Sequence, residues 1–286
     1  MGRDCLSKIS MLNFGILATA NKFRQTDTEE DLKSQKEYYK IDMSIPMIIH
    51  QTWKTSDIPE IFQKYQQTWM TNHPGWEYRF YNDHDCRQYV KKKYPELLEL
   101  YDHLPRQIQR IDIFRYLVIK KEGGLYADID MECLRPMTRL FSGRNCLFSI
   151  EAHLTTQRQK ELGYPEPYQI GNCIFASEPS HWFFNTIIDR ITRLSGSSVR
   201  DDKDVEDTTG PRMLTRLYYE LDEDRKADIA ILRQIHLMPP LEYPNIFPFN
   251  LKMYARHHNA GTWKTGKSSQ SLKRRWIERN RLPSFW

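Results

Sequence analysis

Residues 110–134, with the sequence RIDIFRYLVIKKEGGLYADIDMECL, decide the fold that we predict for this chain. In the first half of this stretch, apolar residues recur at helical spacing, and Gly123 and Gly124 then permit the backbone to leave the helix. Beyond the glycines, apolar and polar residues alternate, which predicts a strand with one polar face. That face carries Tyr126, Asp128, Asp130 and Glu132. Three carboxylates on one face of a strand repel one another, so the pattern favours a bound cation.

The predicted helix carries Asp112 and Arg115 on a face beside its apolar one. Taken alone, these two residues form a surface ion pair, and the acidic strand is the solvated edge of a sheet. Taken together, the block resembles the sugar-nucleotide signature of DXD-type glycosyltransferases, a DxxR…GGxYxDxD run. The resemblance implies that Asp128 and Asp130 hold a metal ion against the diphosphate of the donor. It also implies that Asp112 and Arg115 contact the donor sugar and its phosphate, and that Tyr126 bonds to the diphosphate or ribose.

An apolar run, IPMIIHQTWK at residues 45–54, predicts a buried parallel strand near the start of the ordered chain. The run is similar to the opening strand of the fungal initiating mannosyltransferases and inositol-phosphorylceramide mannosyltransferases. In that family the tryptophan at the position of Trp53 is implied to stack on the nucleotide base. The alternative is that Trp53 is a core residue.

Two motifs in the second half of the chain extend the resemblance. The strand-like run IGNCIFA contains Asn172, which the family places beside the donor sugar. A bulge or turn after Gly171 is the alternative explanation of that asparagine. The run TGPRMLTR predicts a helix that begins at Gly210 and Pro211, and the family implies that this element shapes the donor-sugar and acceptor pocket.

The last motif is HHNAGTW at residues 257–263, which resembles the HHxxGSW run of the family. The resemblance implies that His257 or His258 completes a metal site or contacts the diphosphate, and that Trp263 closes over the β-phosphate. Adjacent residues on an extended segment face opposite ways, so we expect one of the two histidines to bind the metal. Imidazole suits Mn²⁺ better than Mg²⁺, so Mn²⁺ is the expected ion and Mg²⁺ the alternative.

The order of predicted elements gives a doubly wound α/β fold, and the resemblance implies that this fold is GT-A-like. It has a mostly parallel nucleotide-binding sheet flanked by helices and a mixed C-terminal acceptor half. We expect a polar lead-in at residues 1–43, one catalytic domain at residues 44–265, and a basic, aromatic tail at residues 266–286. Residues 155–167 are polar and interrupted by glycine and proline, which predicts a long loop over the site.

Charge, cysteine content and hydropathy together indicate which partners and which cellular compartment to expect. The net charge of +5 over 286 residues, without a recognition motif, argues against nucleic acid binding. The five cysteines are odd in number and form no Cys-x-x-Cys, which favours free thiols in a reducing compartment. No apolar run is long enough to span a bilayer, so we expect a soluble protein, cytoplasmic or peripheral to a membrane, with a secreted effector as the alternative. The tail favours a helix docked on the domain, and contact with anionic lipid is its alternative.

The predicted function is a metal-dependent transfer of a hexose from GDP-mannose or a UDP-sugar to a glycan, lipid or protein acceptor. The resemblance implies that the transfer retains the anomeric configuration, and that Asp112, Arg115, Asp128, Asp130 and Asn172 form the catalytic set. A metal-dependent phosphohydrolase and a non-catalytic module that binds sugar nucleotides are the two rival functions.

Overall fold

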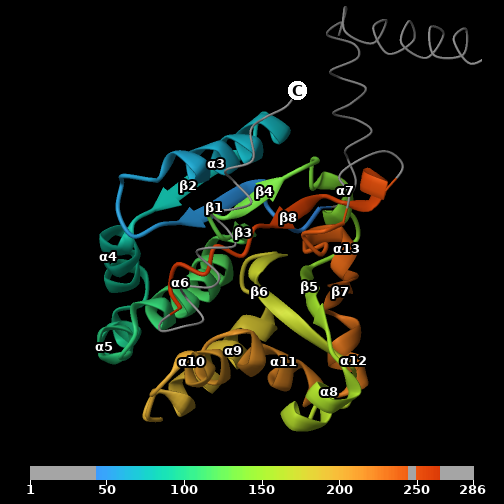
Figure 1. The fold of residues 1–286 in the computed structure, drawn as a ribbon. Helices are drawn as coiled ribbons and strands as arrows, with labels where there is room; N and C mark the ends of the chain where they lie inside the picture. The colour runs from blue at the N-terminus through green and yellow to red at the C-terminus, as the bar shows by residue number, and fades with distance from the viewer. Residues whose placement is uncertain (1–42, 244–248, 265–286) are drawn as a thin grey trace, which may run out of the picture. The chain divides into compact units, whose positions relative to one another are not determined.

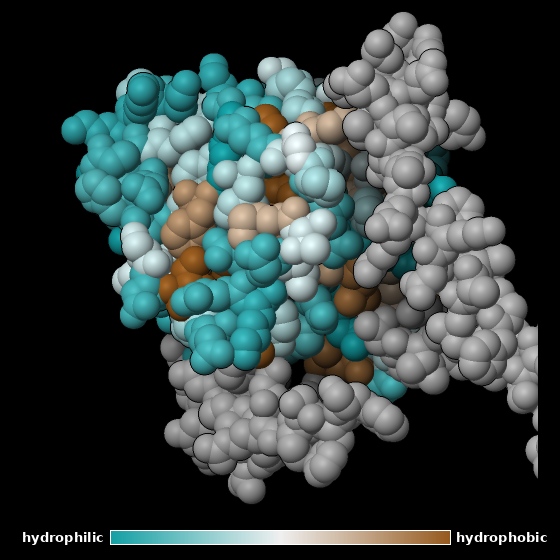
Figure 2. Space-filling view, turned by 90° about the horizontal axis from the view of Figure 1, so that it is seen from above, coloured by the Kyte–Doolittle hydropathy of each residue, from teal (hydrophilic) through white to brown (hydrophobic). Residues whose placement is uncertain are grey.

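The computed structural model describes residues 43–243 and 249–264, which lie in one compact unit that begins at Met43. The predicted lead-in up to residue 42 and the predicted tail at residues 266–286 lie outside the described ranges. Within the described part, no helix is long and apolar enough to cross a bilayer. Figure 2 shows one surface of the molecule, on which hydrophilic residues predominate and hydrophobic residues form small patches.

A six-stranded sheet forms the centre of the described unit, in the strand order β2-β1-β3-β6-β5-β7 (Figure 1). The strands are β1 (Ile48–Thr52), β2 (Glu77–Tyr81), β3 (Gly124–Ala127), β5 (Cys146–His153), β6 (Tyr168–Ser177) and β7 (Ala230–Leu232). β1 pairs in parallel with both β2 and β3, and β5 pairs in parallel with β7. β6 runs antiparallel to both β3 and β5. The expected α/β architecture is therefore confirmed, with a mainly parallel sheet and a mixed second half.

Helices cover both faces of this sheet. The first half contributes α3 (Glu60–Asn72), α4 (Asp83–Lys93), η2 (Pro95–Leu97), α5 (Leu98–His103) and α6 (Gln107–Glu122). The second half contributes α7 (Thr138–Phe141), α8 (Thr156–Leu162), α9 (Trp182–Leu194), α10 (Asp202–Thr208), α11 (Pro211–Tyr219), α12 (Glu223–Ala227), α13 (Gln234–Leu237) and η3 (Phe249–Lys252). One apolar core joins α6, α9 and α11 to the sheet, and a second joins α3 and α7 to its other face. The alternation of β3 divides its side chains between the two cores, with Tyr126 in the first and Leu125 in the second.

α6 is buried on all sides rather than on one face. The helix forms where the apolar spacing predicts it, but every residue from 112 to 119 is buried, including Asp112 and Arg115. The reason is that α6 packs between β3 and α9, which follows it by some sixty residues in the chain. The interpretation of Asp112 and Arg115 as a surface ion pair is therefore wrong, since each side chain is at most 4% exposed.

The predicted acidic strand is broken at its centre. β3 ends at Ala127, residues 128–130 form a turn, and β4 (Met131–Cys133) begins a separate two-stranded sheet with β8 (Ala255–His257). The turn is closed by the Met131 amide, which donates to the Asp128 carbonyl at 3.0 Å. The alternation of polar and apolar residues suggested one strand because it continues across the turn, but the two halves pair with different partners. Asp128 and Asp130 are consequently brought together by a turn and not by a shared strand face.

The loop predicted at residues 155–167 contains a helix, α8. The Thr155 hydroxyl accepts a hydrogen bond from the Arg158 amide at 3.2 Å, and Gly163 ends the helix with a φ of +69°. These two residues are a standard start and stop for a short helix, so the prediction of an unstructured loop is wrong.

The cysteines within the described residues are free and buried: Cys86, Cys133, Cys146 and Cys173. Cys5 lies outside the described ranges. The thiol state agrees with the prediction, while the cellular compartment stays a prediction.

Candidate active site

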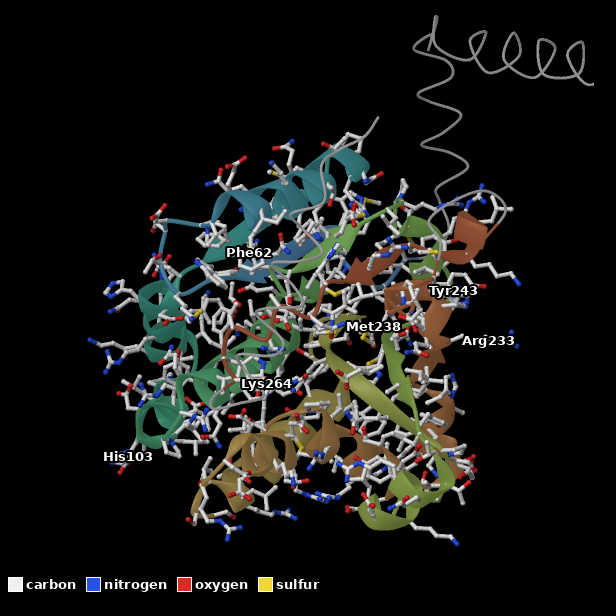
Figure 3. The ribbon with its side chains drawn as sticks, viewed as in Figure 1. Phe62, His103, Arg233, Met238, Tyr243 and Lys264 are labelled. Atoms are coloured by element: carbon white, nitrogen blue, oxygen red, sulfur yellow. The ribbon has the colours of Figure 1, made fainter. Side chains whose placement is uncertain are left out.

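A cavity of about 750 Å³ opens beside the carboxyl ends of β1 and β3. All the predicted site residues except Tyr126 and His258 line it. Those lining residues are Trp53, Asp112, Arg115, Asp128, Asp130, Asn172, Gly210, Pro211, His257 and Trp263. Three further lining residues, Phe62, Met238 and Lys264, lie toward the middle of the view in Figure 3.

Three ligand side chains converge on one wall of this cavity. One carboxylate oxygen each of Asp128 and Asp130 and one ring nitrogen of His257 lie within 4.8 Å of one another. The β4–β8 pairing causes this convergence, because it places Met131 opposite His257. Two carboxylates and an imidazole form a donor set that suits a divalent first-row metal ion such as Mn²⁺, so the residues fit the cation that the sequence predicts.

Both carboxylate oxygens of Asp130 have partners in this wall of the cavity. Its Oδ2 accepts a hydrogen bond from the Ala260 amide at 2.8 Å, and its Oδ1 lies 3.3 Å from His257 Nε2. Burial alone would raise the pKa of Asp130, but His257 and the Ala260 amide more than offset it, so its pKa is lowered. Burial opposes a charge on His257, yet the neighbouring Cys173 and Asp130 raise its pKa well above the usual value.

Asp128 is held by two groups, Arg115 in the cavity wall and the fully buried Tyr126. Arg115 Nη1 lies 3.2 Å from its Oδ1, and the Tyr126 hydroxyl donates to the same oxygen at 2.9 Å. Burial raises the pKa of Asp128 against the opposing charge of Arg115. The Tyr126 ring is fully buried and does not line the cavity, so its hydroxyl contacts Asp128 and not the diphosphate or ribose that the resemblance implied.

Asp112 and Arg115 form a buried polar network with Asn172 of β6 and with Thr209, which lies between α10 and α11. Arg115 Nη2 lies 3.3 Å from Asp112 Oδ1, and Arg115 Nη1 donates to the Asn172 carbonyl at 2.8 Å. Asp112 accepts from Asn172 Nδ2 at 3.0 Å and from the Thr209 hydroxyl at 2.7 Å. Burial is the main reason why the pKa of Asp112 rises to about 6, and Arg115 opposes that rise. The network therefore joins three distant segments of the chain at the cavity wall.

The two adjacent histidines point apart, as expected for an extended segment. His257 joins Asp128 and Asp130, whereas His258 Nε2 lies 2.9 Å from Glu132 Oε2. The His258 ring also stacks on Tyr65, with 4.1 Å between ring centroids. His257 is thus the histidine that faces the candidate metal position.

Two tryptophans lie at the rim of the cavity. Trp53 is half-buried and packs against Phe62, with 4.9 Å between ring centroids. Trp263 is also half-buried. The residue after it, Lys264, forms an ion pair with Glu206, with 3.6 Å between Lys264 Nζ and Glu206 Oε1. Both indoles therefore keep part of their surface available to a ligand.

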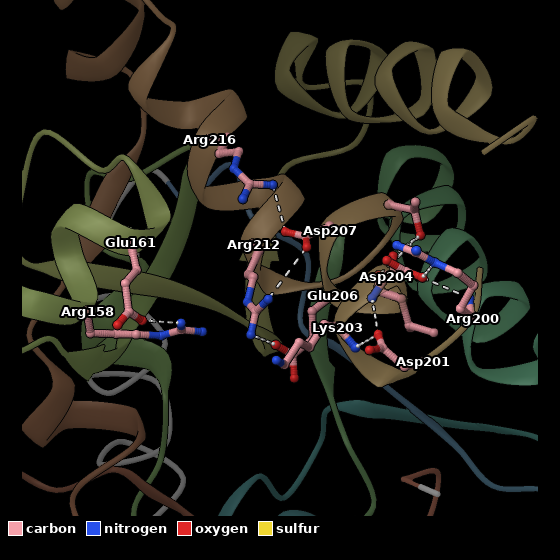
Figure 4. Close-up of polar contacts among 12 residues, drawn as sticks. Arg158, Glu161, Arg200, Asp201, Lys203, Asp204, Glu206, Asp207, Arg212 and Arg216 are labelled. Carbon is pink, nitrogen blue, oxygen red and sulfur yellow. Dashed lines mark hydrogen bonds and ion pairs between the residues drawn. The ribbon is translucent and has the colours of Figure 1, made fainter. Parts of the chain in front are cut away.

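Gly210 and Pro211 are positioned by the tight turn between α10 and α11. Two ion pairs join the helices (Figure 4). Arg212 Nη2 lies 2.9 Å from Glu206 Oε2, and Arg216 Nη1 lies 2.7 Å from Asp207 Oδ1. A Cβ atom on Gly210 would lie 2.9 Å from the Glu206 Cα, so a larger residue would push the helices apart.

Two groups of the site were missed by the sequence analysis. Thr209, which bonds to Asp112, stands directly before Gly210, so the same motif could have identified it. The Ala260 amide that binds Asp130 has no sequence signal, because a backbone donor is available at almost any residue.

Comparison with known proteins gives a family match for one segment of the chain. Residues 59–147, which include both aspartates of the candidate metal position, match the family described as "Glycosyltransferase sugar-binding region containing DXD motif". This segment belongs to the DXD-containing glycosyltransferase family. The DXD region ends before β6, so Asn172, Thr209 and His257 lie outside the matched residues.

The chain is also similar to fungal proteins. Inositol phosphoceramide mannosyltransferase 3 of Schizosaccharomyces pombe is 38% identical over 111 residues, which cover 39% of this chain and 31% of that protein. Inositol phosphoceramide mannosyltransferase 2 of the same organism is 26% identical over 219 residues, which cover 77% of this chain and 58% of that protein. The chain thus spans less than two thirds of the length of both relatives.

Among solved structures, the PaToxG glycosyltransferase is similar with a TM-score of 0.46 and 18% identity. The match covers 66% of this chain and 77% of that one. At this score the likeness is distant.

Proposed function

We propose that this chain is a metal-dependent glycosyltransferase that moves a hexose from a nucleotide-diphosphate sugar to an acceptor hydroxyl. The observation that supports this proposal most is the convergence of Asp128, Asp130 and His257 on the wall of a 750 Å³ cavity. Trp53 lines the same cavity and offers an indole face for the nucleotide base. A cavity of this volume accommodates a ligand the size of a sugar nucleotide.

Asp128, Asp130 and His257 would hold the divalent cation. When bound there, it offsets the negative charge of the departing nucleoside diphosphate. Arg115 keeps Asp128 in position, since Arg115 Nη1 lies 3.2 Å from Asp128 Oδ1. Tyr126 holds the same carboxylate through its hydroxyl.

Asp112 and Asn172 are proposed to bind the donor hexose. Asp112 faces the cavity and is fixed by Asn172, Thr209 and Arg115, so its carboxylate cannot turn away. A carboxylate offers about four acceptor sites, which leaves capacity for hydroxyl groups of a sugar. We further propose that the products retain the anomeric configuration of the donor.

Both relatives named above are mannosyltransferases, so GDP-mannose is the donor that we propose first. Their names also make an inositol-bearing lipid the first acceptor to test, ahead of a glycolipid, a glycan or a protein. A two-metal phosphohydrolase would need a second set of ligands. Within residues 43–243 and 249–264, however, Asp128, Asp130 and His257 are the one such group.

Donor hydrolysis tests the proposal. The full chain is incubated with Mn²⁺ and, in turn, GDP-mannose, UDP-glucose, UDP-galactose and UDP-N-acetylglucosamine, and free sugar and nucleoside diphosphate are measured. We expect slow release of both products from one donor, loss of release with a chelator, and loss of release in Asp128→Asn. Asp102→Asn, which removes an acid from an exposed ion pair with Arg87, is the matched control.

The other outcomes would identify the rival functions. Phosphate release from simple phosphate esters in place of donor cleavage would indicate a phosphohydrolase. Tight binding of a donor without any turnover would indicate a binding module. The anomeric configuration of the released sugar, followed by NMR at early times, tests retention.

A further inference from the structure

A carboxylate that the proposed mechanism does not use lines the same cavity. Glu151 lies on β5 and is half-buried. The pairing of β5 with β6 runs from Ile150 opposite Ile170 to Ala152 opposite Gln169, so Glu151 is one extra residue in the strand. A bulge of this kind re-aims a side chain, and bulges are frequent beside active sites. The bulge therefore explains why an acidic side chain in the interior of β5 lines the cavity.

The neighbours of Glu151 hold it in this position. Gln169 Nε2 donates to Glu151 Oε2 at 2.8 Å, and Gln234 Nε2 donates to the Glu151 carbonyl at 2.7 Å. A Cβ atom on Gly171 would lie 3.1 Å from the Glu151 Cβ and 2.7 Å from the Met238 Cε. The glycine thus leaves the space that both side chains occupy. The backbone and the carboxylate of Glu151 are both fixed, and no group of the described residues bonds to the second carboxylate oxygen, Oε1, which is left for another partner.

The charges around Glu151 indicate what kind of partner that is. Within the described ranges, no Lys, Arg or His side chain forms an ion pair with Glu151. His257 and Lys264 act on it at longer range and favour its charge, whereas Glu206 disfavours it. Burial is the largest influence and raises its pKa. A carboxylate kept in a cavity without a cationic partner repels phosphate groups and accepts hydrogen bonds from neutral hydroxyls.

We propose that Glu151 binds the transferred hexose, with Oε1 accepting hydrogen bonds from one or two sugar hydroxyls. This inference rests on the proposed function, because it requires a nucleotide-sugar in the cavity. It divides the cavity into a diphosphate end at Asp128, Asp130 and His257 and a hydroxyl-binding wall on β5. Gln169 is then a positioning residue, since it acts through Glu151.

The test compares the binding of a nucleotide-sugar with the binding of its nucleoside diphosphate. Isothermal titration with Mn²⁺ measures GDP-mannose against GDP, and UDP-glucose, UDP-galactose and UDP-N-acetylglucosamine against UDP. For Glu151→Gln we expect the affinity for the nucleotide-sugar to fall at least about tenfold, which is the effect of losing a charge-assisted hydrogen bond. The affinity for the diphosphate should change less than twofold. Glu161→Gln, on the exposed surface of α8, should change neither affinity.

A second variant covers the case in which Glu151→Gln fails to fold. Gln169→Met keeps the carboxylate but removes the amide that orients it, so we expect a loss of a few-fold for the nucleotide-sugar alone. Equal losses for sugar nucleotide and diphosphate, or no loss in either variant, would overturn the inference while the proposed function stands. Failure of the wild-type chain to bind any of these nucleotides would overturn both.

Discussion

Alanine at Gly123 should destabilise the protein far more than alanine at Gly163. Both glycines end a helix, with φ of +66° and +69°. A Cβ atom at Gly123 would lie 2.7 Å from Pro46 Cδ, 2.8 Å from Pro179 Cδ and 2.9 Å from Pro179 N. At Gly163, no atom of the described residues lies within 4 Å of the added Cβ. Of the two positions, Gly123 alone combines a positive φ with a steric conflict.

The expected difference in the free energy of unfolding follows from the backbone strain and any steric conflict at each glycine. Gly163 lies in the left-handed helical region with ψ of 29°, where alanine costs roughly 1–2 kcal/mol. Reduced freedom of the unfolded chain offsets about 0.4–1 kcal/mol of that cost. Gly123 has ψ of −164°, a region that is essentially restricted to glycine and costs of order 1–3 kcal/mol. Overpacking against two rigid proline rings adds about 1–3 kcal/mol. From the middle of each range, we expect Gly123→Ala to lose roughly 2–3 kcal/mol more than Gly163→Ala.

Urea unfolding followed by circular dichroism measures the difference. With a slope of roughly 2 kcal/mol per molar urea, the midpoint of Gly123→Ala should lie about 1 M below that of Gly163→Ala. Because Gly123 joins α6 to β3, the displaced strand should also weaken donor turnover through Asp128. Equal midpoints for the two variants would show that the contacts with Pro46 and Pro179 do not constrain the chain, and would refute this reasoning.

Three further predictions concern single side chains. Trp53→Ala should weaken nucleoside diphosphate binding about tenfold or more and Trp53→Phe much less, because base stacking is worth about 1–3 kcal/mol; isothermal titration measures both, and equal losses would contradict a stacking role. Arg115→Met should lower the free energy of unfolding by roughly 3 kcal/mol, since it leaves buried carboxylates without their partner. Arg87→Met removes an arginine from an exposed ion pair and should cost less than about 1 kcal/mol in the same urea assay. Similar costs for Arg87→Met and Arg115→Met would contradict the expectation that burial makes the Arg115 contacts more important. Burial lowers the pKa of His50 to about 4, so the stability that neutral His50 provides above pH 6.5 is lost as pH falls toward 4. Between pH 7 and pH 4 the wild type should lose about 3 kcal/mol more than His50→Gln, and parallel pH profiles from urea unfolding would contradict this.

The sequence predicted most of the elements that carry the site, because their signals are local. The helix at α6, the two glycines after it and the strand β3 follow from spacing and from the positive φ of glycine. The short apolar run at β1 likewise predicted a parallel strand, and β1 pairs in parallel with β2 and β3. These features depend on neighbours a few residues away, so their patterns can be recognised in the sequence alone.

The parts that the sequence did not predict depend on distant partners. The break between β3 and β4 exists because the Asp128 amide donates to the Cys173 carbonyl at 2.8 Å and β4 pairs with β8. No pattern within the acidic run could show either partner. The bulge at Glu151 depends on pairing with β6, and the bond from Thr209 to Asp112 joins residues 97 apart in the sequence. Periodicity shows which residues share a face of an element, but not what lies opposite that face.

Asp130 has two roles that a pair of substitutions can separate. Its carboxylate is a candidate metal ligand, and it also holds the C-terminal segment by accepting the Ala260 amide at 2.8 Å. Asp130→Asn removes the charge but keeps an oxygen that can accept from Ala260, whereas Asp130→Ala removes both. We expect both variants to lose Mn²⁺ affinity to a similar extent in isothermal titration. Asp130→Ala should be less stable than Asp130→Asn by about 1–3 kcal/mol in urea unfolding, because the buried Ala260 amide is left without an acceptor. If the two variants unfold at the same urea concentration, the Ala260 bond does not secure the segment that carries His257, and the cavity wall must be held by the β4–β8 pairing alone.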